Sequence, residues 1–330
     1  MSEAYTVLIF LLLLGQAKSN KKQNNLNKLN IIQQETFYEP LIKISMKKLV
    51  ISLFCITTFA CMGISKEKAE IKFRVASYNL RMDTPNDSLN AWSYRKEAVK
   101  ALINYHDFDI FGTQEGFLHQ LQNVCELPAY TYTGSGRDDG KDAGEHSAIV
   151  YKKDKFTVLE SGDFWLRENP AEPGLGWDAT CCNRICSWAK FKDNDSGAEF
   201  YFFNVHFDHQ GVEARKESGK LMIQKIKEIA GDMPVISTGD YNSTPDTEQI
   251  KGLSAFLRDS REITEQPPYG PEGTFNRRFT FPVGPHRIDY IFVSNQFKVT
   301  RYGVLTDQRD NTVYYPSDHQ PVVTDLILIK

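Results

Sequence analysis

The sequence lacks any excess of positive charge. Its 39 lysine and arginine residues are outnumbered by 42 aspartates and glutamates, which leaves a formal net charge of −3. Residues 1–61 hold seven lysines against three glutamates, so the rest of the chain is more acidic, at −7. Proteins that bind a nucleic-acid backbone without sequence preference use clustered lysine and arginine. The composition therefore argues against such a protein, although it leaves room for an enzyme whose bound cations supply the positive charge.

Cys-x-x-Cys pairs and long apolar runs are also lacking. Beyond residue 61 the sequence holds Cys125, Cys181, Cys182 and Cys186, and no two of them have the Cys-x-x-Cys spacing of a zinc site. We therefore expect buried or disulfide-bonded cysteines. The apolar run that begins at Leu49 extends for about a dozen residues, which is short of the roughly 20 that a transmembrane helix needs.

Residues 46–61 have the layout of a secretory signal peptide. A methionine is followed by two lysines, an apolar run and small residues at the end. This pattern predicts that Met46 is the physiological start and that residues 1–45 are a non-native upstream extension. The product would then be exported to the periplasm or the extracellular space. Whether Cys61 carries a lipid anchor stays open, because the residues before it match the bacterial lipoprotein pattern poorly.

From residue 70 onward, strand-like and helix-like segments interleave without repeats or long linkers, which favours a single domain over residues 70–330. Apolar residues at helical spacing predict helices at 93–105, at 212–229 and after Pro245. Apolar and aromatic runs predict strands at 71–82, 108–115, 146–153, 185–192, 199–209, 235–238, 287–294, 297–305 and 321–329.

Many of these predicted strands end in short sets of polar residues. The sets lie at 77–79, 114–115, 204–209, 240–242, 289 and 317–319. In α/β folds, strand ends and the loops that follow them line the functional site. Asp240 and Asn242 are two residues apart, so on extended backbone their side chains point to the same side. Carboxylates and amides bind hard cations, and imidazoles transfer protons near neutral pH, so the pattern favours metal-assisted phosphate chemistry.

Taken in chain order, the segments Asn79, "QE" at 114–115, "NVHFDH" at 204–209, "GDYN" at 239–242, "RIDYIF" at 287–292 and "SDHQPV" at 317–322 resemble the endonuclease/exonuclease/phosphatase superfamily. The resemblance covers residues 70–330 and points to a secreted bacterial branch. It implies a DNase I-like α/β fold, a four-layered sandwich of two packed, mostly antiparallel sheets flanked by helices. It also implies Mg²⁺-dependent hydrolysis of a phosphoester, with Mn²⁺ as a substitute.

The resemblance also assigns roles to individual residues. Four side chains match the family's metal ligands, namely Asn79, Glu115, Asn242 and Asp318. Four more match its catalytic groups, namely His206, Asp240, Asp289 and His319. Asp289 corresponds to the acid that holds His319, and Asp240 and Asn242 to the pair that orients the attacking water. Which histidine is the acid, which is the base, and whether one or two metals bind all stay open.

Three further residues are candidates for binding substrate or phosphate. Glu145 precedes a strand where several family members hold a supporting acid, and its alternative is a surface loop charge. Arg184 could form a fork on phosphate, or a salt bridge with a surface carboxylate. Alternation along the predicted strand 199–209 puts Asp208 on the same face as His206 and His209 on the other.

The substrate is the least determined feature. We expect a phosphate mono- or diester of a small molecule or lipid, of the sugar phosphate, inositol phosphate or sphingomyelin type. A secreted nuclease that uses the same site is the alternative, although nucleic acid is not the favoured partner because the body lacks a basic groove interleaved with aromatics. A catalytically inactive binding module is disfavoured, since all the matched acids and histidines are present. No stable protein partner is implied.

Overall fold

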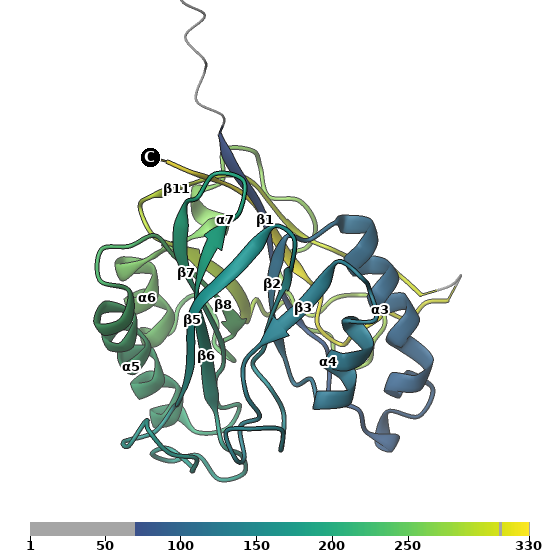
Figure 1. The fold of residues 1–330 in the computed structure, drawn as a ribbon. Helices are drawn as coiled ribbons and strands as arrows, with labels where there is room; N and C mark the ends of the chain where they lie inside the picture. Colours follow the sequence, from purple (N-terminus) through teal and green to yellow (C-terminus); the bar gives the residue numbers. More distant parts are fainter. Residues whose placement is uncertain (1–69, 310–311, 330) are drawn as a thin grey trace, which may run out of the picture. The chain divides into compact units, whose positions relative to one another are not determined.

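Two six-stranded sheets pack against each other at the centre of the molecule (Figure 1). The structure, a computed structural model, describes residues 70–309 and 312–329. The predicted upstream extension and signal peptide lie outside the described residues and stay predictions. Within the described part of the chain, no helix has both the length and the apolar character needed to cross a membrane.

Each sheet contains one parallel strand pair, and its other pairs are antiparallel. The first sheet has the order β11 (Phe297–Val304), β12 (Val322–Leu328), β1 (Ile71–Asn79), β2 (Ile110–Gln114), β4 (Ile149–Lys152) and β3 (Tyr130–Thr133). The second has the order β5 (Phe156–Trp165), β6 (Ile185–Asp193), β7 (Glu199–His206), β8 (Val235–Asp240), β10 (Asp289–Val293) and β9 (Arg258–Asp259). The parallel pairs are β1 with β2 and β7 with β8. This confirms the predicted fold class.

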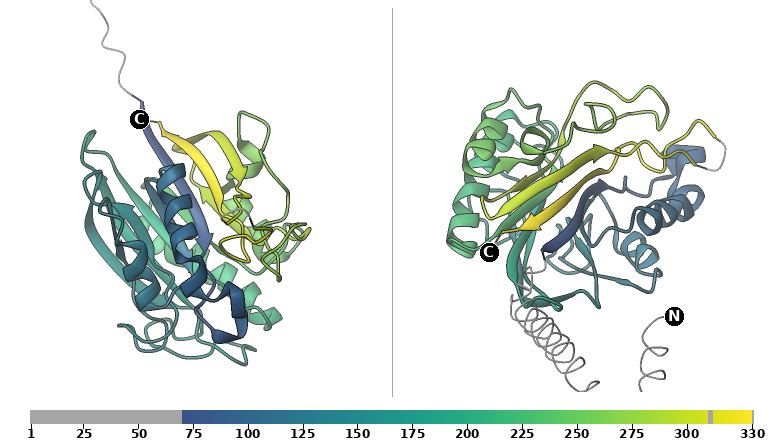
Figure 2. Two further views of the ribbon diagram at one scale, coloured as in Figure 1. Left: turned by 90° about the vertical axis from the view of Figure 1, so that its right-hand side faces the viewer. Right: turned by 90° about the horizontal axis from the view of Figure 1, so that it is seen from above.

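Helices cover the outer face of each sheet, which makes four layers. The view from above in Figure 2 shows α3 (Trp92–His106) and α4 (Leu118–Val124) on one side of the strands, with α5 (Val212–Ala230) and α6 (Glu248–Phe256) on the other. The predicted helices at 93–105 and 212–229 are confirmed to within one residue at each end. Two short helical segments, η2 (Pro85–Asn90) and α7 (Ser260–Ile263), lie in connections.

Strand β1 shows how the sequence builds these layers. Phe73 and Val75 belong to the core between the sheets, whereas Ala76 and Tyr78 belong to the core beneath α3 and α4. Alternate side chains of a strand point to opposite faces, so the half of β1 that is covered on both faces, residues 75–79, is buried throughout. Phe73 packs on Phe200 of the second sheet, with ring centroids 5.0 Å apart, and thereby joins the two sheets.

A buried asparagine fixes the two sheets to each other near the ends of their central strands. Asn204 on β7 donates to the carbonyl oxygens of Thr113 and Ala148, at 2.7 and 3.0 Å. Its own oxygen accepts from Gln114 Nε2 at 2.7 Å and from Thr238 at 2.9 Å. Four hydrogen bonds to strands of both sheets satisfy the buried amide, so it sets the distance between the layers.

Gly112 on β2 makes this close approach feasible. A Cβ atom built there would lie 2.1 Å from Asn204 Oδ1 and 2.2 Å from Thr238 Oγ1. We expect Gly112→Ala to lower the free energy of unfolding by about 1–3 kcal/mol, because the sheets must separate or the asparagine must move.

The matched control is Gly252→Ala in α6, where the nearest atom, on Ile223, is 3.8 Å away. In a helix interior this change should stabilise by about 0.5–1 kcal/mol. Urea unfolding of both variants checks the pair. Equal effects of the two changes would contradict the close-packing explanation.

Candidate active site

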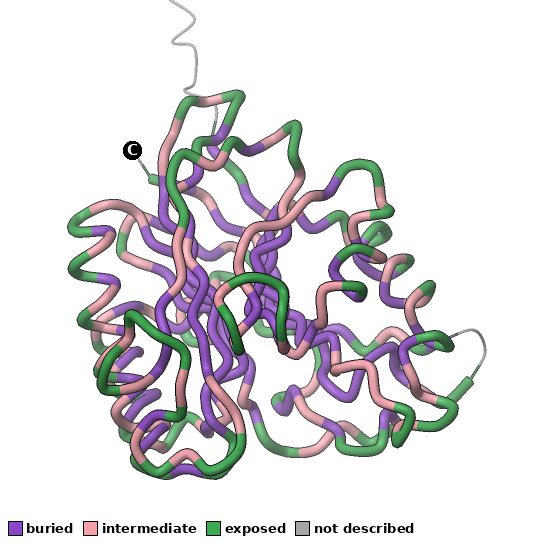
Figure 3. Tube along the Cα trace, turned by 60° about the horizontal axis from the view of Figure 1, so that its bottom comes forward, coloured by how far each residue is buried: buried purple, intermediate pink, exposed green. Residues whose placement is uncertain are grey.

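The ladder registers bring the predicted polar residues to one end of the molecule. Asn79 pairs with Gln114 at the ends of β1 and β2, and Asp240 pairs with both His206 and Asp289. Figure 3 turns this end forward and shows buried segments surrounded by exposed loops. A cavity of about 240 Å³ opens here; its lining includes the predicted residues Glu115, Glu145, Arg184, His206, Asp240, Asn242, Asp318 and His319. The remaining three candidates, Asn79, Asp289 and Asp208, each contact a residue of this lining.

Backbone conformations that are rare outside glycine occur at this cavity. Glu115, Asn242 and Arg81 have φ angles of 62°, 45° and 57°. Left-handed backbone costs energy for these side chains and is found preferentially at functional sites. Glu115 directly follows β2, and its left-handed backbone turns the carboxylate back into contact with Asn79. For this reason a residue just past the strand end can line the cavity.

Glu115 is held by three groups. Asn79 Nδ2 donates to Glu115 Oε1 at 3.0 Å and to Asp240 Oδ2 at 3.1 Å, and Met82 N donates to Glu115 Oε2 at 3.1 Å. Arg81 Nη1 lies 3.5 Å from the same carboxylate. Burial alone would raise the pKa of Glu115, but the charges of His319 and Arg81 and the hydrogen bonds outweigh it, so its pKa is lowered. Glu115 is therefore an anion, whereas the nitrogen of Asn79 serves to orient it.

Burial disfavours the charged form of two neighbouring carboxyls, Asp240 and Asp318. Burial, reinforced by the charge of Asp289, raises the pKa of Asp240 to about 7. Burial also raises the pKa of Asp318 to about 6 although His319 opposes the shift, and its Oδ1 has no hydrogen-bond partner among the described residues. Ligand atoms of Glu115, His206 and Asp240 lie within 4.8 Å of one another. Clustered, partly unpaired carboxylate oxygens are the donor set of a hard divalent cation, so the residues fit such an ion.

One histidine of the site is fixed by a buried carboxylate. His319 Nδ1 lies 2.8 Å from Asp289 Oδ2, and Thr274 donates to the same oxygen at 2.6 Å. Burial opposes the charged imidazole, but Asp289 and Asp240 outweigh it and raise the pKa of His319 well above its usual range. The ring packs on Phe275, with centroids 4.7 Å apart. This arrangement leaves Nε2 of His319 on the cavity side, 3.7 Å from Asp240.

The second histidine has the opposite electrostatic environment. His206 Nε2 lies 3.5 Å from Asp240, and its Nδ1 lies 3.9 Å from Glu145. Burial, together with the charges of Arg184 and Arg137, lowers the pKa of His206 well below its usual range. Asp240 thus lies between two imidazoles of which one is neutral and the other is held as a cation.

Basic side chains from three loops line one wall of the cavity, which we call the basic wall: Arg137, Arg184 and His209. Strand β7 ends at His206, so the alternation expected for Asp208 and His209 does not extend to them. His209 lines the cavity, whereas the carboxylate of Asp208 accepts from the backbone N–H of Gln210 and Gly211 and pairs with Arg184. Asp208 therefore positions the loop and the arginine.

Three of the four cysteines agree with the expectation of buried or disulfide-bonded residues, whereas Cys125 is free and only partly buried. Cys181 and Cys182 form a disulfide between consecutive residues, whereas Cys125 and Cys186 are free. Cys182 lies in the cavity lining. Cys181 also lies near Asp208 and His209 in a set of potential metal ligands, but the disulfide occupies its sulfur.

Sequence reasoning missed several residues of the site. Arg81 follows the strand that bears Asn79 and contacts Glu115 and Asp318, at 3.5 and 4.0 Å. Arg137 pairs with Glu145 at 2.6 Å, and Phe275 and Thr274 hold His319 and its partner. These residues lie outside the strand-end motifs, and an isolated arginine or phenylalanine in a loop carries no local signal of its role.

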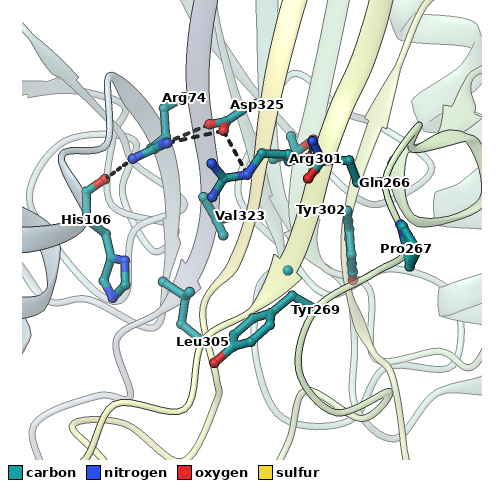
Figure 4. Close-up of a pocket in the computed structure, with 12 residues that line it drawn as sticks. Arg74, His106, Gln266, Pro267, Tyr269, Arg301, Tyr302, Leu305, Val323 and Asp325 are labelled. Carbon is teal, nitrogen blue, oxygen red and sulfur yellow. Dashed lines mark hydrogen bonds and ion pairs between the residues drawn. The ribbon is translucent and has the colours of Figure 1, made fainter.

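A second cavity, of about 270 Å³, lies along β11 and β12 (Figure 4). Its charged groups are matched to one another. Asp325 contacts Arg74 at 2.7 Å and Arg301 at 3.4 Å, and Arg74 also donates to the carbonyl oxygen of His106. Both imidazoles and most of the acids predicted from the sequence line the first cavity, and none of them lines this one. The candidate active site is therefore the cavity at the strand ends.

Comparison with known proteins agrees with an active site in the cavity at the strand ends. The profile of the Endonuclease/Exonuclease/phosphatase family matches residues 76–319. A mannosyl-6-phosphatase from Bacteroides thetaiotaomicron is 47% identical, with a TM-score of 0.75 over 78% of this chain and 100% of that structure. A Bacteroides vulgatus family protein is 40% identical, with a TM-score of 0.73 over 78% of this chain and 99% of that structure.

Curated sequences match less completely. An uncharacterized protein of Acanthamoeba polyphaga mimivirus is 28% identical over 166 residues, which are 47% of this chain and 61% of that protein. The alignment with a second mimivirus protein covers 38% of that protein's length. The profile match covers more than half of the chain, from β1 through His319, and includes the acids and imidazoles of the cavity. This chain therefore belongs to the Endonuclease/Exonuclease/phosphatase family.

Proposed function

We propose that the chain is a divalent-metal-dependent phosphoesterase that hydrolyses a phosphate ester of a small molecule. The observation that carries the proposal is the convergence of Glu115, Asp240, Asp318 and two histidines on one cavity. These groups come from both sheets and from segments up to about 200 residues apart, so their meeting at one site is a property of the fold.

The cation in this proposal is Mg²⁺, with Mn²⁺ as a substitute, because the donor set consists of carboxylate and amide oxygens. Glu115 and Asp318 would hold it, with Asn242 beside them. Asn79 would contribute by orienting Glu115, since its oxygen already accepts from the backbone N–H of Arg81 at 2.9 Å. The bound ion would supply Lewis-acid stabilisation of the charge on the phosphoryl oxygens.

The side chains supply the proton chemistry and the orientation. Asp240 accepts from Asn242 N at 2.9 Å and from Asn79 Nδ2, so one carboxylate is held by two donors at the cavity wall. This geometry suits it to accept a hydrogen bond from the attacking water. His319, fixed at Nδ1 by Asp289, presents Nε2 for a hydrogen bond to a phosphoryl oxygen.

A sugar phosphate is the substrate class that we propose first. The support is the 47% identity to a mannosyl-6-phosphatase that this chain aligns with over that structure's full length. Export through the predicted signal peptide would place the activity in the periplasm or outside the cell, and this also remains a proposal.

Hydrolysis assays test the proposed function. Purified protein should release phosphate from mannose 6-phosphate and nitrophenol from p-nitrophenyl phosphate when Mg²⁺ or Mn²⁺ is present. EDTA should abolish both activities, and added Mg²⁺ should restore them. Activity that is indifferent to chelation, or no activity on any of a panel of sugar, lipid and nucleic-acid phosphoesters, would contradict the proposal.

A further inference from the structure

An arginine–histidine pair next to His206 has donors that no described group of the protein satisfies. Arg184 is 5% exposed and lines the cavity. Its Nη2 contacts His209 Nδ1 at 2.7 Å, and its Nε faces Asp208 at 3.5 Å as an ion pair. Nε and Nη1 have no hydrogen-bond partner among the described residues. A buried guanidinium with unmade hydrogen bonds is costly, so the arrangement favours a ligand that supplies acceptors.

The contact with Arg184 also fixes the tautomer of His209. A guanidinium has no acceptor and keeps its proton, so Nδ1 of His209 must accept and the ring hydrogen must lie on Nε2. Burial and the charge of Arg184 lower the pKa of His209, which agrees with a neutral ring. His209 therefore offers one further N–H at the cavity lining.

A second guanidinium lies beside the first. Arg137 lines the cavity and uses Nη1 to bind Glu145 at 2.6 Å, while its buried Nε has no hydrogen-bond partner in the described part of the chain. Arg137, Arg184 and His209 all line the strand-end cavity of about 240 Å³. Two guanidinium groups and the N–H of His209 are thus present at one cavity.

We propose that Arg184, His209 and Arg137 form a subsite for the terminal oxygens of a phosphate monoester dianion. The proposal rests on the proposed function and adds the residues that select a monoester over a diester. A monoester has three terminal oxygens and close to two negative charges at neutral pH, whereas a diester has two such oxygens and one charge. Forked donors and a second cation match the additional oxygen and charge of the monoester, because charge-assisted hydrogen bonds are the stronger kind. The subsite therefore makes the chain prefer monoesters to diesters.

The test compares both ester classes in one variant. We expect Arg184→Gln to lower kcat/KM for p-nitrophenyl phosphate by about 100-fold, and to change that for bis-p-nitrophenyl phosphate far less. Arg184→Lys should recover part of the loss, since it restores charge without the fork. Arg301→Gln, at the second cavity, is the matched control and should leave both activities unchanged. Equal losses on the two esters in Arg184→Gln would overturn the proposal.

Two further measurements keep the test independent of folding and of turnover. Arg184→Gln leaves Asp208 without its cation. His209→Leu changes no charge; it removes the Nε2 donor and the Nδ1 acceptor that holds Arg184 Nη2, and it should show the same selective loss at about 10-fold. Inorganic phosphate should bind the wild type more tightly than Arg184→Gln in calorimetry. Unchanged phosphate binding would overturn the subsite. If the wild type cleaves neither ester but binds phosphate through Arg184, the subsite stands and the proposed function fails.

Discussion

Asp240→Asn is expected to lower kcat by about 10³-fold or more while the protein stays folded. The carboxylate is 1% exposed and lies within 4 Å of both His206 and His319. Asparagine keeps the shape of the side chain, but it can neither take up a proton nor present two acceptor oxygens to Asn79 and the attacking water. Steady-state kinetics at saturating metal and substrate measure the effect.

Asp325→Asn is the matched control for this change. Asp325 is also paired with a basic group, Arg74, but it lies in the second cavity (Figure 4). Its replacement should leave kcat unchanged. If Asp240→Asn retains more than a tenth of the wild-type kcat, Asp240 does not act on the reacting water.

Asp289→Asn is expected to lower kcat by about 10²–10⁴-fold with little change in KM. Asp289 accepts from Nδ1 of His319 and so directs Nε2 toward the cavity. An amide can donate to Nδ1 instead, which would favour the wrong tautomer and remove the charge that stabilises the imidazolium. The residue is 1% exposed, so it acts on a substrate through its neighbours: it orients His319, and its charge helps to raise the pKa of Asp240.

A change at Thr274 tests how Asp289 is positioned. Thr274→Val keeps the side-chain shape but removes the hydroxyl that donates to Asp289 at 2.6 Å and accepts from the backbone N–H groups of Ile288 and Asp289, both at 3.1 Å. It should cost about 10-fold in kcat, less than the loss of the carboxylate itself. A larger loss in Thr274→Val than in Asp289→Asn would show that the local structure, and not the charge on Asp289, controls the rate.

The strand ends could be predicted from the sequence, because their signal is local. A run of apolar residues that stops at Asp, Asn or His marks both the strand and its functional end, as at Asp240 and His206. The edge strands β3 and β5 are missed by the sequence patterns, since the exposed middle of β5 has no apolar alternation. Their positions depend on pairing with β4 and β6, and no pattern within the edge strands themselves reports that pairing.

The basic wall of the cavity could not be predicted for a different reason. Arg184 and His209 meet across 25 residues, and Arg137 reaches Glu145 from within a loop. These contacts depend on the connection between β3 and β4, on the start of β6 and on the end of β7. The alternation rule failed at Asp208 because β7 stops two residues earlier. The structure was required to show that Arg184 faces the cavity and that Asp208 holds it.

The most direct measurement is anomalous X-ray scattering from crystals of residues 70–330 soaked in Mn²⁺. If carboxylates of both sheets converge to hold a cation for phosphoester cleavage, the strongest anomalous peak will lie in the strand-end cavity beside Glu115, and Glu115→Gln will remove it. A peak elsewhere, or no ordered Mn²⁺ at Glu115 under conditions in which the enzyme is active, would contradict a metal-centred active site at these strand ends.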